Sequence, residues 1–263
     1  MRANALRTAW AEGRHTANGW LSIPSAFAAE VMAHQPWDSL TIDLQHGLVD
    51  YQTAVGMLQA ISTTDVVPMV RVPWLDPGII MKTLDAGSYG VICPMIDDRH
   101  QAAAFVRACR YPPRGNRSMG PIRATLYAGE DYARHANDTV LAFAMIETAG
   151  ALEDLDAILA TDGLDGVYVG PSDLSAALGC PAVLDPTEPA VVAAIERIVT
   201  AAKRAGRFAG IHTGAPAYAR RMHELGFDFV SLASDARLLA LKARESIAEI
   251  RGETAPSGAA RGY

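Results

Sequence analysis

The stretch Gly166-Val-Tyr-Val-Gly-Pro-Ser-Asp-Leu-Ser-Ala-Ala-Leu-Gly179 decides how the chain folds. Its first five residues form a short apolar run, which predicts a buried strand, and a helix is expected to follow. Asp173 then lies just past the strand end, beside the backbone N–H groups of the new helix, where an anion can bind. Strand and helix in direct succession are typical of α/β folds.

A second acid, Glu147, ends another apolar run at residues 140–147. Carboxylates at the ends of neighbouring strands suit a hard divalent cation, because such ions prefer oxygen ligands. A carboxylate that closes a buried strand also needs a partner or a metal. Glu147 and Asp173 therefore predict metal-assisted chemistry on a small carboxylate substrate.

Short apolar runs alternate with amphipathic segments along the whole chain, as expected for parallel strands covered by helices. Eight such units predict a (β/α)8 TIM barrel rather than an open nucleotide-binding sheet. No G-x-G-x-x-G or Walker A pattern follows any of the runs, which agrees with this choice. The predicted strands are 20–23, 39–43, 66–72, 90–93, 140–147, 166–170, 208–212 and 229–232, and the predicted helices include 26–33, 51–61, 77–86, 98–110, 151–160, 189–205 and 215–225.

Length and composition suit one such domain. The 263 residues are half apolar and contain no linker-like stretch, so we expect a single barrel over residues 1–251 and a mobile tail at 252–263. The net charge of −6 gives no reason to expect nucleic acid or an anionic membrane surface as a partner. No apolar run is long enough to span a bilayer, and the three separated cysteines form no disulfide framework, so a cytoplasmic location is expected.

Polar residues converge on one end of the predicted barrel. His46 follows the second strand, Arg71 ends the third, Glu147 the fifth and His212 the seventh, while Asp173 follows the sixth. Barrel enzymes carry their chemistry at these strand ends. Each residue also has a structural alternative, such as a helix cap for Asp173 or an ion pair for Arg71. The functional interpretation rests on the convergence.

One connection, at residues 111–137, is long, polar and rich in glycine and proline. Long connections in compact domains commonly act as lids or subunit contacts. Because this one follows the fourth strand, it is expected to lie over the barrel mouth.

The positions of the lysines distinguish between two mechanisms for making or breaking a carbon–carbon bond. A Schiff-base enzyme needs a lysine at a strand end, but Lys82, Lys203 and Lys242 all fall within predicted helices. A metal as electron sink is the remaining route. Two protein carboxylates leave coordination positions for water and for a chelating 2-oxo acid.

These residues resemble the HpcH/HpaI aldolase family, the class II pyruvate aldolases of the phosphoenolpyruvate/pyruvate superfamily, over residues 19–240. The motifs that carry the resemblance are Gly-Pro-Ser-Asp-Leu-Ser-Ala (170–176), Asp-x-x-His-Gly (43–47), and Cys-Arg-Tyr-Pro-Pro-Arg-Gly (109–115) with Gly-Pro-Ile-Arg-Ala (120–124). The resemblance implies reversible, divalent-metal-dependent cleavage of a 4-hydroxy-2-oxo acid to pyruvate, or hydroxypyruvate, and an aldehyde. It also implies a hexamer, a trimer of dimers in which the C-terminal helices (here 236–250) are exchanged; an eighth helix packed on its own barrel fits the pattern equally well.

The resemblance further implies roles for individual residues. Glu147 and Asp173 would hold Mg²⁺ or Mn²⁺, with Co²⁺ or Zn²⁺ as alternatives, and the backbone N–H groups of Ser172 and Asp173 would bind the substrate carboxylate. Arg71 would stabilise the enolate oxygen. The remaining implied roles are proton transfer by His46, pairing of Asp85 with that histidine, and lining of the pocket by Trp20.

The chain departs from the family pattern at Gln45, where many members have glutamate, at Met145, where glutamine is common, and at His212, where the residue is frequently apolar. We expect these changes to alter the polarity around the oxo acid, with His212 as a substrate-binding residue, and to leave the metal ligands intact. Two other functions stay open: a citrate-lyase-β-like or malyl-CoA-type lyase, and a non-catalytic barrel that binds oxo acids.

Overall fold

The computed structural model describes residues 1–253, so the predicted tail lies outside the described residues from residue 254 onward. Eight parallel strands pair in chain order and β8 pairs with β1, which closes the barrel and confirms the predicted (β/α)8 fold. The strands are β1 (Thr16–Leu21), β2 (Ser39–Asp43), β3 (Val67–Arg71), β4 (Gly90–Cys93), β5 (Leu141–Ile146), β6 (Gly166–Val169), β7 (Phe208–Thr213) and β8 (Phe229–Leu232).

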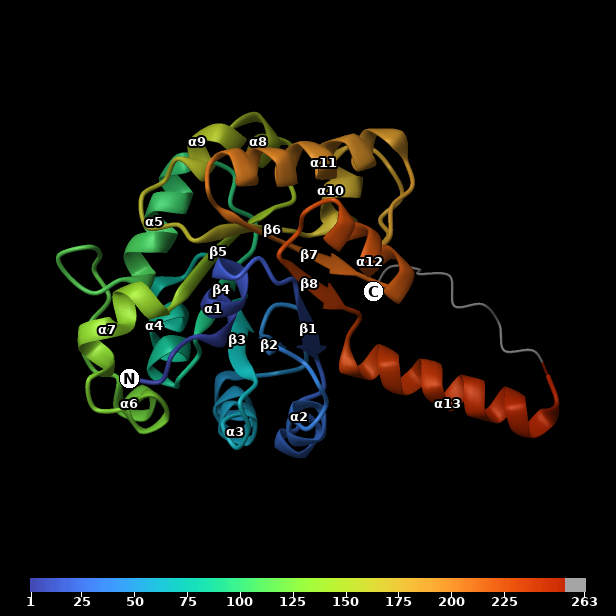
Figure 1. Ribbon diagram of the computed structural model, residues 1–263, viewed down its shortest axis with the longest axis horizontal. Coiled ribbons are helices and arrows are strands. Elements are labelled where there is room, and N and C mark those ends of the chain that lie inside the picture. The colour runs from blue at the N-terminus through green and yellow to red at the C-terminus, as the bar shows by residue number, and fades with distance from the viewer. Residues whose placement is uncertain (254–263) are drawn as a thin grey trace.

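Helices surround the barrel on its outside (Figure 1). Side-chain caps start several of them: Ser25 accepts from the Ala28 N–H, Asp50 from Thr53 and Asp98 from Gln101. The helices are α1 (Ala5–Ala11), α2 (Ala26–Ala33), α3 (Tyr51–Ile61), α4 (Pro77–Asp85), α5 (Arg99–Cys109), α6 (Ile122–Ala128), α7 (Tyr132–Thr139), α8 (Ala149–Glu153), α9 (Leu155–Leu159), α10 (Pro171–Ala177), α11 (Pro189–Arg204), α12 (Pro216–Glu224) and α13 (Asp235–Arg251).

Helix α1 packs against the N-terminal end of the barrel. Its Trp10 ring lies 5.9 Å from Phe143 and 5.8 Å from Phe229, centroid to centroid, and its indole N–H donates to Thr16 Oγ1. The barrel is therefore filled by side chains at this end, and space for a ligand has to come from the opposite end, where the strands finish.

The first strand begins four residues earlier than its predicted start at residue 20. Thr16 and Asn18 are polar and interrupt the apolar pattern, yet both are buried in the barrel. Asn18 is satisfied there, because it donates to Ser231 Oγ and accepts from the hydroxyls of Ser39 and Thr41. A polar cross-strand network thus occupies a place where the pattern predicted none. The predicted helix 151–160 is in fact two short helices, α8 and α9.

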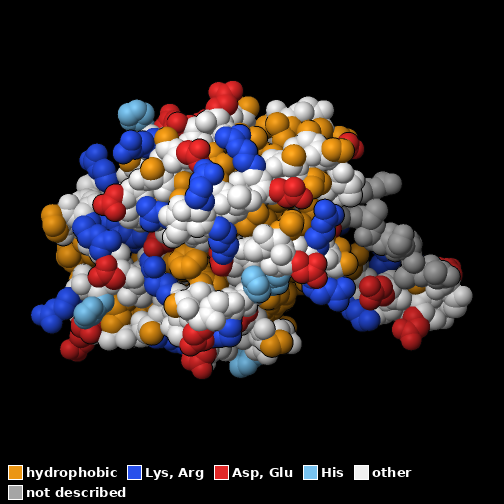
Figure 2. All heavy atoms as spheres, turned by 45° about the horizontal axis from the view of Figure 1, so that its top comes forward, with side chains coloured by type: hydrophobic (Ala, Val, Ile, Leu, Met, Phe, Trp, Pro, Cys, Tyr) orange, Lys and Arg blue, Asp and Glu red, His pale blue; other side chains and the backbone are white. Residues whose placement is uncertain are grey.

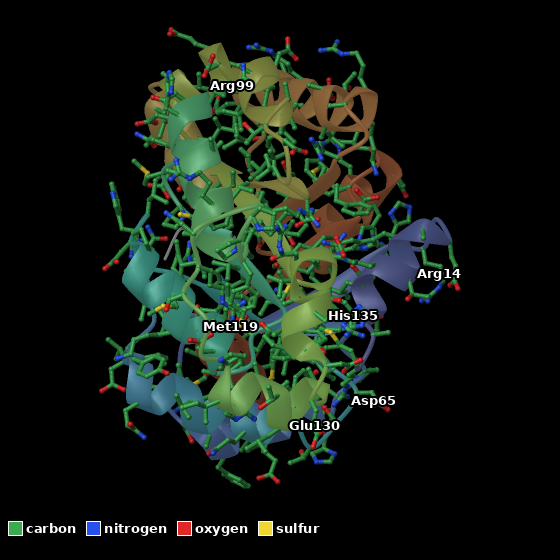
Figure 3. The ribbon with its side chains drawn as sticks, turned by 90° about the vertical axis from the view of Figure 1, so that its left-hand side faces the viewer. Arg14, Asp65, Arg99, Met119, Glu130 and His135 are labelled. Carbon is green, nitrogen blue, oxygen red and sulfur yellow. The ribbon has the colours of Figure 1, made fainter. Side chains whose placement is uncertain are left out.

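The expectation that residues 111–137 cover the barrel mouth is wrong. Helix α5 follows β4 and carries the chain back to the N-terminal end before this connection begins. Met119 and His135 of the connection lie on the same face as Arg14 and Asp65, which belong to the loops before β1 and β3 (Figure 3). The Arg2 N–H also donates to the Ala128 carbonyl at 2.7 Å. The connection folds into α6 and α7 on the face opposite the strand ends.

Helix α13 leaves the barrel instead of packing on it as an eighth barrel helix (Figure 1). Of its side chains, only Asp235 and Ala248 are buried, and Leu239 and Ile250 are 66% and 85% exposed. Asp235 anchors the first turn, since its carboxylate accepts from the Ser22 N–H and hydroxyl.

The face shown in Figure 2 carries lysine and arginine intermingled with aspartate and glutamate, with no large area of one sign. No helix within residues 1–253 is both long and apolar enough to cross a bilayer.

Candidate active site

Two adjoining cavities open at the C-terminal ends of the strands. The larger has a volume of about 390 Å³ and includes Trp20, His46, His212 and Arg237 in its wall. The smaller, of about 10 Å³, is narrow. Its lining residues are Trp20, Arg71, Met145, Tyr168, Gly170, Pro171, Ser172, Asp173, Leu184 and His212. Most of the residues predicted from the strand ends therefore meet in one place.

Arg71 is held by a buried salt bridge to Asp43. Arg71 Nε donates to Oδ1 at 2.8 Å and Nη2 to Oδ2 at 2.6 Å, a bidentate geometry that fixes the guanidinium plane. The guanidinium also lies over the Trp20 ring, 4.8 Å from its centroid. Burial alone would raise the pKa of Asp43, but Arg71 and the neighbouring N–H donors outweigh it, so that pKa is lowered.

Asp43 also shapes the turn that presents His46. Its Oδ1 accepts from the backbone N–H groups of Gln45 at 3.0 Å and His46 at 3.3 Å. Gly47 is required in this turn, because a Cβ there would lie 2.2 Å from the Asp43 carbonyl oxygen. The His46 side chain is exposed at the wall of the larger cavity. In the sequence, Asp43 is recognisable only as the first residue of the Asp-x-x-His-Gly motif, without a predicted role.

Glu147 follows β5 directly and is buried, with 2% of its surface exposed. Its Oε1 accepts from the Met95 N–H at 2.8 Å, and Met95 adopts a left-handed backbone conformation (φ 55°). Burial, with help from the nearby Asp173 charge, raises the pKa of Glu147 to about 7. Because burial makes the ionised form of this carboxyl unfavourable, a cation bound nearby would stabilise that form.

Gly170, which lines the smaller cavity, leaves room for the Glu147 carboxylate. A Cβ at this position would lie 2.2 Å from Glu147 Oε2 and 2.9 Å from the Met145 methyl carbon. Any larger residue at this position would therefore displace the Glu147 carboxylate. Gly170 belongs to the stretch 166–179 that predicts the fold, so this stretch also provides the space in which Glu147 lies.

Helix α10 begins at the pocket with its first turn uncapped by a side chain, because its N-cap residue is Gly170. The N–H groups of Ser172 and Asp173 belong to this turn, and Ser172 Oγ is buried without a hydrogen-bond partner among residues 1–253. Asp173 itself is exposed at the pocket wall. Buried polar atoms in native proteins have hydrogen-bond partners, so the unpartnered Ser172 Oγ among residues 1–253 indicates a polar ligand.

His212 stands where the two cavities join. It is 5% exposed, its ring meets Trp20 edge to face at 4.7 Å, and its Nδ1 has no hydrogen-bond partner among the described residues. Burial, followed by the charge of Arg71, lowers the pKa of His212 to about 3. The imidazole is therefore neutral at working pH, able to bind a hydroxyl but unable to carry charge.

Asp85 lies elsewhere. It is the last residue of α4, at the N-terminal end of the barrel, and pairs at 2.6 Å with the buried Arg117. Arg117 also donates to the Tyr132 hydroxyl at 3.0 Å. Within one chain, Asp85 and His46 thus occupy opposite ends of the barrel. The expected pairing of the two would need a second copy of the chain.

The donor set fits a divalent ion bound by two carboxylates. No group of three or more metal-ligating side chains occurs among residues 1–253, so Glu147 and Asp173 would leave the other coordination positions to water and substrate. Two observations support this fit most strongly. The pKa of the buried Glu147 carboxyl is raised, and the buried Ser172 Oγ has no hydrogen-bond partner among residues 1–253.

Comparison with known proteins agrees with this geometry. The family model for HpcH/HpaI aldolase/citrate lyase matches residues 18–241. The chain belongs to this family. A hydroxypyruvate/pyruvate aldolase of Rhizorhabdus wittichii is 43% identical over 94% of this chain and 99% of that protein. A 4-hydroxy-2-oxo-heptane-1,7-dioate aldolase of Salmonella arizonae is 38% identical over 99% of both chains. A solved HpcH/HpaI family structure from Burkholderia cenocepacia superposes with a TM-score of 0.88 at 33% identity, over 94% of this chain and 99% of that one.

The family membership confirms the resemblance and the predicted class of enzyme. The chain is an aldolase, a carbon–carbon lyase. The residues that sequence reasoning missed are Asp43, Met95, Gly170 and Leu184. Asp43 and Gly170 each had a signal, since they open the Asp-x-x-His-Gly and Gly-Pro-Ser-Asp motifs; Met95 and Leu184 act through backbone or shape.

Proposed function

We propose that this aldolase cleaves a 4-hydroxy-2-oxo acid, reversibly, to pyruvate or hydroxypyruvate and an aldehyde, with a divalent metal ion as cofactor. The observation that carries the proposal is the pair Glu147 and Asp173 beside Arg71 and the uncapped first turn of α10. Together they offer a cation site, an anion site and a fixed guanidinium at the same end of the barrel. Mg²⁺ or Mn²⁺ suits the all-oxygen ligand set best, and Co²⁺ or Zn²⁺ is the alternative.

When bound by Glu147 and Asp173, the ion supplies a Lewis acid for the keto oxygen of the oxo acid. The chain's own groups do the positioning. The N–H groups of Ser172 and Asp173 hold the substrate carboxylate at the start of α10, and Arg71 stabilises the charge that develops on the keto oxygen. The Asp43 salt bridge and Trp20 keep Arg71 in place.

Proton transfer falls to His46, through a water molecule. It takes the proton of the 4-hydroxyl group as the C3–C4 bond breaks, and it returns a proton to C3 of the enolate. Asp85 can orient His46 only from a neighbouring copy, because the two residues lie at opposite ends of one barrel.

A hexamer with exchanged C-terminal helices would provide such neighbours. Helix α13 leaves its own barrel with Leu239, Ile247 and Ile250 exposed, and packing against a second copy would bury them. The N-terminal face that holds Asp85 also carries exposed apolar side chains, Met119 and Ile122, which a subunit contact would cover.

The donor substrate is pyruvate or hydroxypyruvate. The Rhizorhabdus relative is named for both, and the extra hydroxyl of hydroxypyruvate would have a partner in the neutral His212 imidazole. Met145 offers the oxo acid only an apolar surface at the floor of the pocket. We therefore expect hydroxypyruvate to be accepted at least as well as pyruvate.

Hydrogen–deuterium exchange at C3 of pyruvate, followed by NMR in D₂O, tests the proposal without an aldehyde. Exchange with Mn²⁺ or Mg²⁺ that EDTA abolishes and fresh metal restores is the expected result. Hydroxypyruvate forms the second arm of the experiment. Absence of exchange from both acids would overturn the proposal, and cleavage of a malyl thioester by the same preparation would then favour a citrate-lyase-like activity.

A further inference from the structure

Leu184 is the one residue lining the smaller cavity that comes from a connection without helix or strand. It lies in the segment 178–188, between α10 and α11 (Figure 1), whereas the other lining residues belong to strands or to the start of α10. Its side chain is only 3% exposed, although Ala182 and Thr187 of the same segment are exposed. The connection thus contributes one buried apolar side chain to the site, and the proposed mechanism gives that side chain no role.

The backbone of this segment contributes little to holding Leu184 in place. Among residues 1–253, no N–H group of residues 182–187 donates to a backbone carbonyl. Segments with few backbone hydrogen bonds open at a low cost in free energy. The position of Leu184 therefore depends on side-chain contacts.

Two such contacts follow Leu184 directly in the chain. Asp185 Oδ1 accepts from the Gly214 N–H at 2.6 Å, and the Tyr218 hydroxyl donates to the Pro186 carbonyl at 3.2 Å. Gly214 comes directly after β7, and Tyr218 belongs to α12. Both contacts attach the segment to the end of the barrel where the two cavities open.

Leu184 also lies at the junction of the two cavities. Trp20, Leu184 and His212 line both of them. Trp20 and His212 belong to strands and their rings meet edge to face at 4.7 Å, so Leu184 is the aliphatic member of the three. In the proposed reaction the substrate carboxylate lies at the start of α10 and C3 has to face the aldehyde. C3 of the oxo acid is therefore expected at this junction.

Two reactions compete for the electron pair of the enolate at C3. The enolate can take a proton from bulk water, which regenerates the oxo acid. It can instead attack the carbonyl carbon of the aldehyde, which forms the C3–C4 bond and leaves an alkoxide that takes a proton through His46. Enzymes protect reactive intermediates from the first kind of reaction by excluding water from them. An apolar side chain at the junction has this effect, because it donates no proton and occupies the space of a water molecule.

We infer that Leu184 is a specificity-determining residue that shields C3 of the enolate from bulk water and thereby directs the enolate to the aldehyde. The inference rests on the proposed function and adds a residue to it. Asp185 is then a positioning residue, because its contact with Gly214 holds the segment that carries Leu184.

The test measures both fates of the enolate in one mixture. The enzyme with Mn²⁺ is incubated in D₂O with acetaldehyde, propanal or glycolaldehyde and with whichever of pyruvate and hydroxypyruvate exchanges faster. NMR then gives the initial ratio of deuterium in the recovered oxo acid to aldol product. Because both come from the same enolate, this ratio does not depend on how much of a variant is folded or metal-loaded.

Leu184→Ala should raise the ratio of exchange to aldol product about 10-fold, because it opens the junction to water. Leu184→Met keeps an apolar side chain of similar volume and should stay within about 3-fold of the wild type. Asp185→Ala should raise the ratio less than Leu184→Ala, since the leucine is still present. Calorimetry should give the same affinity for the oxo acid in all variants, because its carboxylate and keto oxygen are bound by other residues.

Val183→Ala is the matched control. It shortens a half-buried apolar side chain next to Leu184 in the same segment, and it should leave the ratio unchanged. An unchanged ratio in Leu184→Ala, an equal rise in Val183→Ala, or wild-type exchange without aldol product from any of the three aldehydes would overturn the inference alone. Absence of exchange from both oxo acids in the wild type would overturn the proposed function, and this inference with it.

Discussion

Two acids at opposite ends of the barrel, Asp165 and Glu147, are buried in opposite ways. At the N-terminal end, Asp165 accepts from Arg7, from Arg110 at 2.6 Å and from the Ala142 N–H at 2.8 Å. At the C-terminal end, Glu147 accepts from one backbone N–H among residues 1–253, that of Met95, and its acidic neighbour Asp173 makes its charge less favourable. Both carboxylates are buried or nearly so, but only one is saturated.

This difference indicates that Asp165 serves the stability of the fold, whereas Glu147 serves its function. A buried carboxylate with several donors contributes to a unique packing and offers nothing to a ligand. A buried carboxylate with one donor costs folding free energy, and the fold retains it at the open end of the barrel, beside the orphaned Ser172 Oγ. We therefore expect mutations at the two ends to affect different measurements.

The largest expected effect is at the unsaturated end. Glu147→Gln and Asp173→Asn should each lower kcat/KM for aldol cleavage by about 1,000-fold or more, because the metal supplies several kcal/mol of charge stabilisation. Steady-state kinetics over a Mn²⁺ titration and direct Mn²⁺ binding by calorimetry would measure both effects. Glu153→Gln, at an exposed position of α8, is the matched control. Near-full activity of either variant at low Mn²⁺ would remove the metal assignment.

At the N-terminal end, where Asp165 accepts several hydrogen bonds, a mutation should lower stability rather than activity. Asp165→Asn leaves Arg7 and the buried Arg110 without their counter-charge, which should lower the free energy of unfolding by about 3–5 kcal/mol. Urea denaturation at one protein concentration would measure it. Asp156→Asn breaks an exposed pair with Arg204 and should cost about 1 kcal/mol or less. If Asp165→Asn lost activity while keeping its stability, the two ends would not differ as described.

His46 tests whether the exposed residues of the site act in catalysis or in binding. His46→Ala should slow aldol cleavage about 100-fold, since it removes the proton-transfer group, and leave pyruvate binding within about 2-fold. Cleavage kinetics and pyruvate titration by calorimetry give the two numbers. His34→Ala, exposed at the end of α2, serves as control. Equal losses in cleavage and binding would make His46 a structural residue.

The sequence predicted the C-terminal end better than the N-terminal end, for physical reasons. Parallel strands are buried on both faces, so their apolar runs were visible, and residues that follow such runs meet at one rim. Arg71, Glu147, Asp173 and His212 were placed together on this basis, and the structure places them at that rim.

Contacts between side chains that are far apart in the sequence produce no sequence pattern comparable to these apolar runs. The partner of Asp85 is Arg117, 32 residues away, and the polar residues of β1 are satisfied by strands distant in sequence. Neither spacing nor hydropathy encodes such contacts. The position of residues 111–137 does not follow from the strand before them, because α5 first returns the chain to the N-terminal end of the barrel.

The smallest expected effect concerns His212 and depends on pH. Its folded-state pKa of about 3 lies below the ordinary value of 6.5, so the unfolded chain binds a proton more readily than the folded one. Stability is therefore fully present above pH 6.5 and declines as pH falls from there toward 3. Between pH 6.5 and pH 5 the loss amounts to about 2 kcal/mol.

Urea unfolding at pH 7 and pH 5 would measure this decline in the wild type and in His212→Asn and His212→Leu. Both variants lack the titrating group, so each should lose about 2 kcal/mol less than the wild type over this range, whatever its stability at pH 7. Two variants are needed because leucine fills the site without a polar atom and asparagine keeps one. An unchanged pH dependence in both would mean that His212 accepts a proton in the folded protein. The rim would then contain a charged imidazole beside Arg71, and the contrast between its unsaturated acid and the saturated N-terminal end would need another explanation.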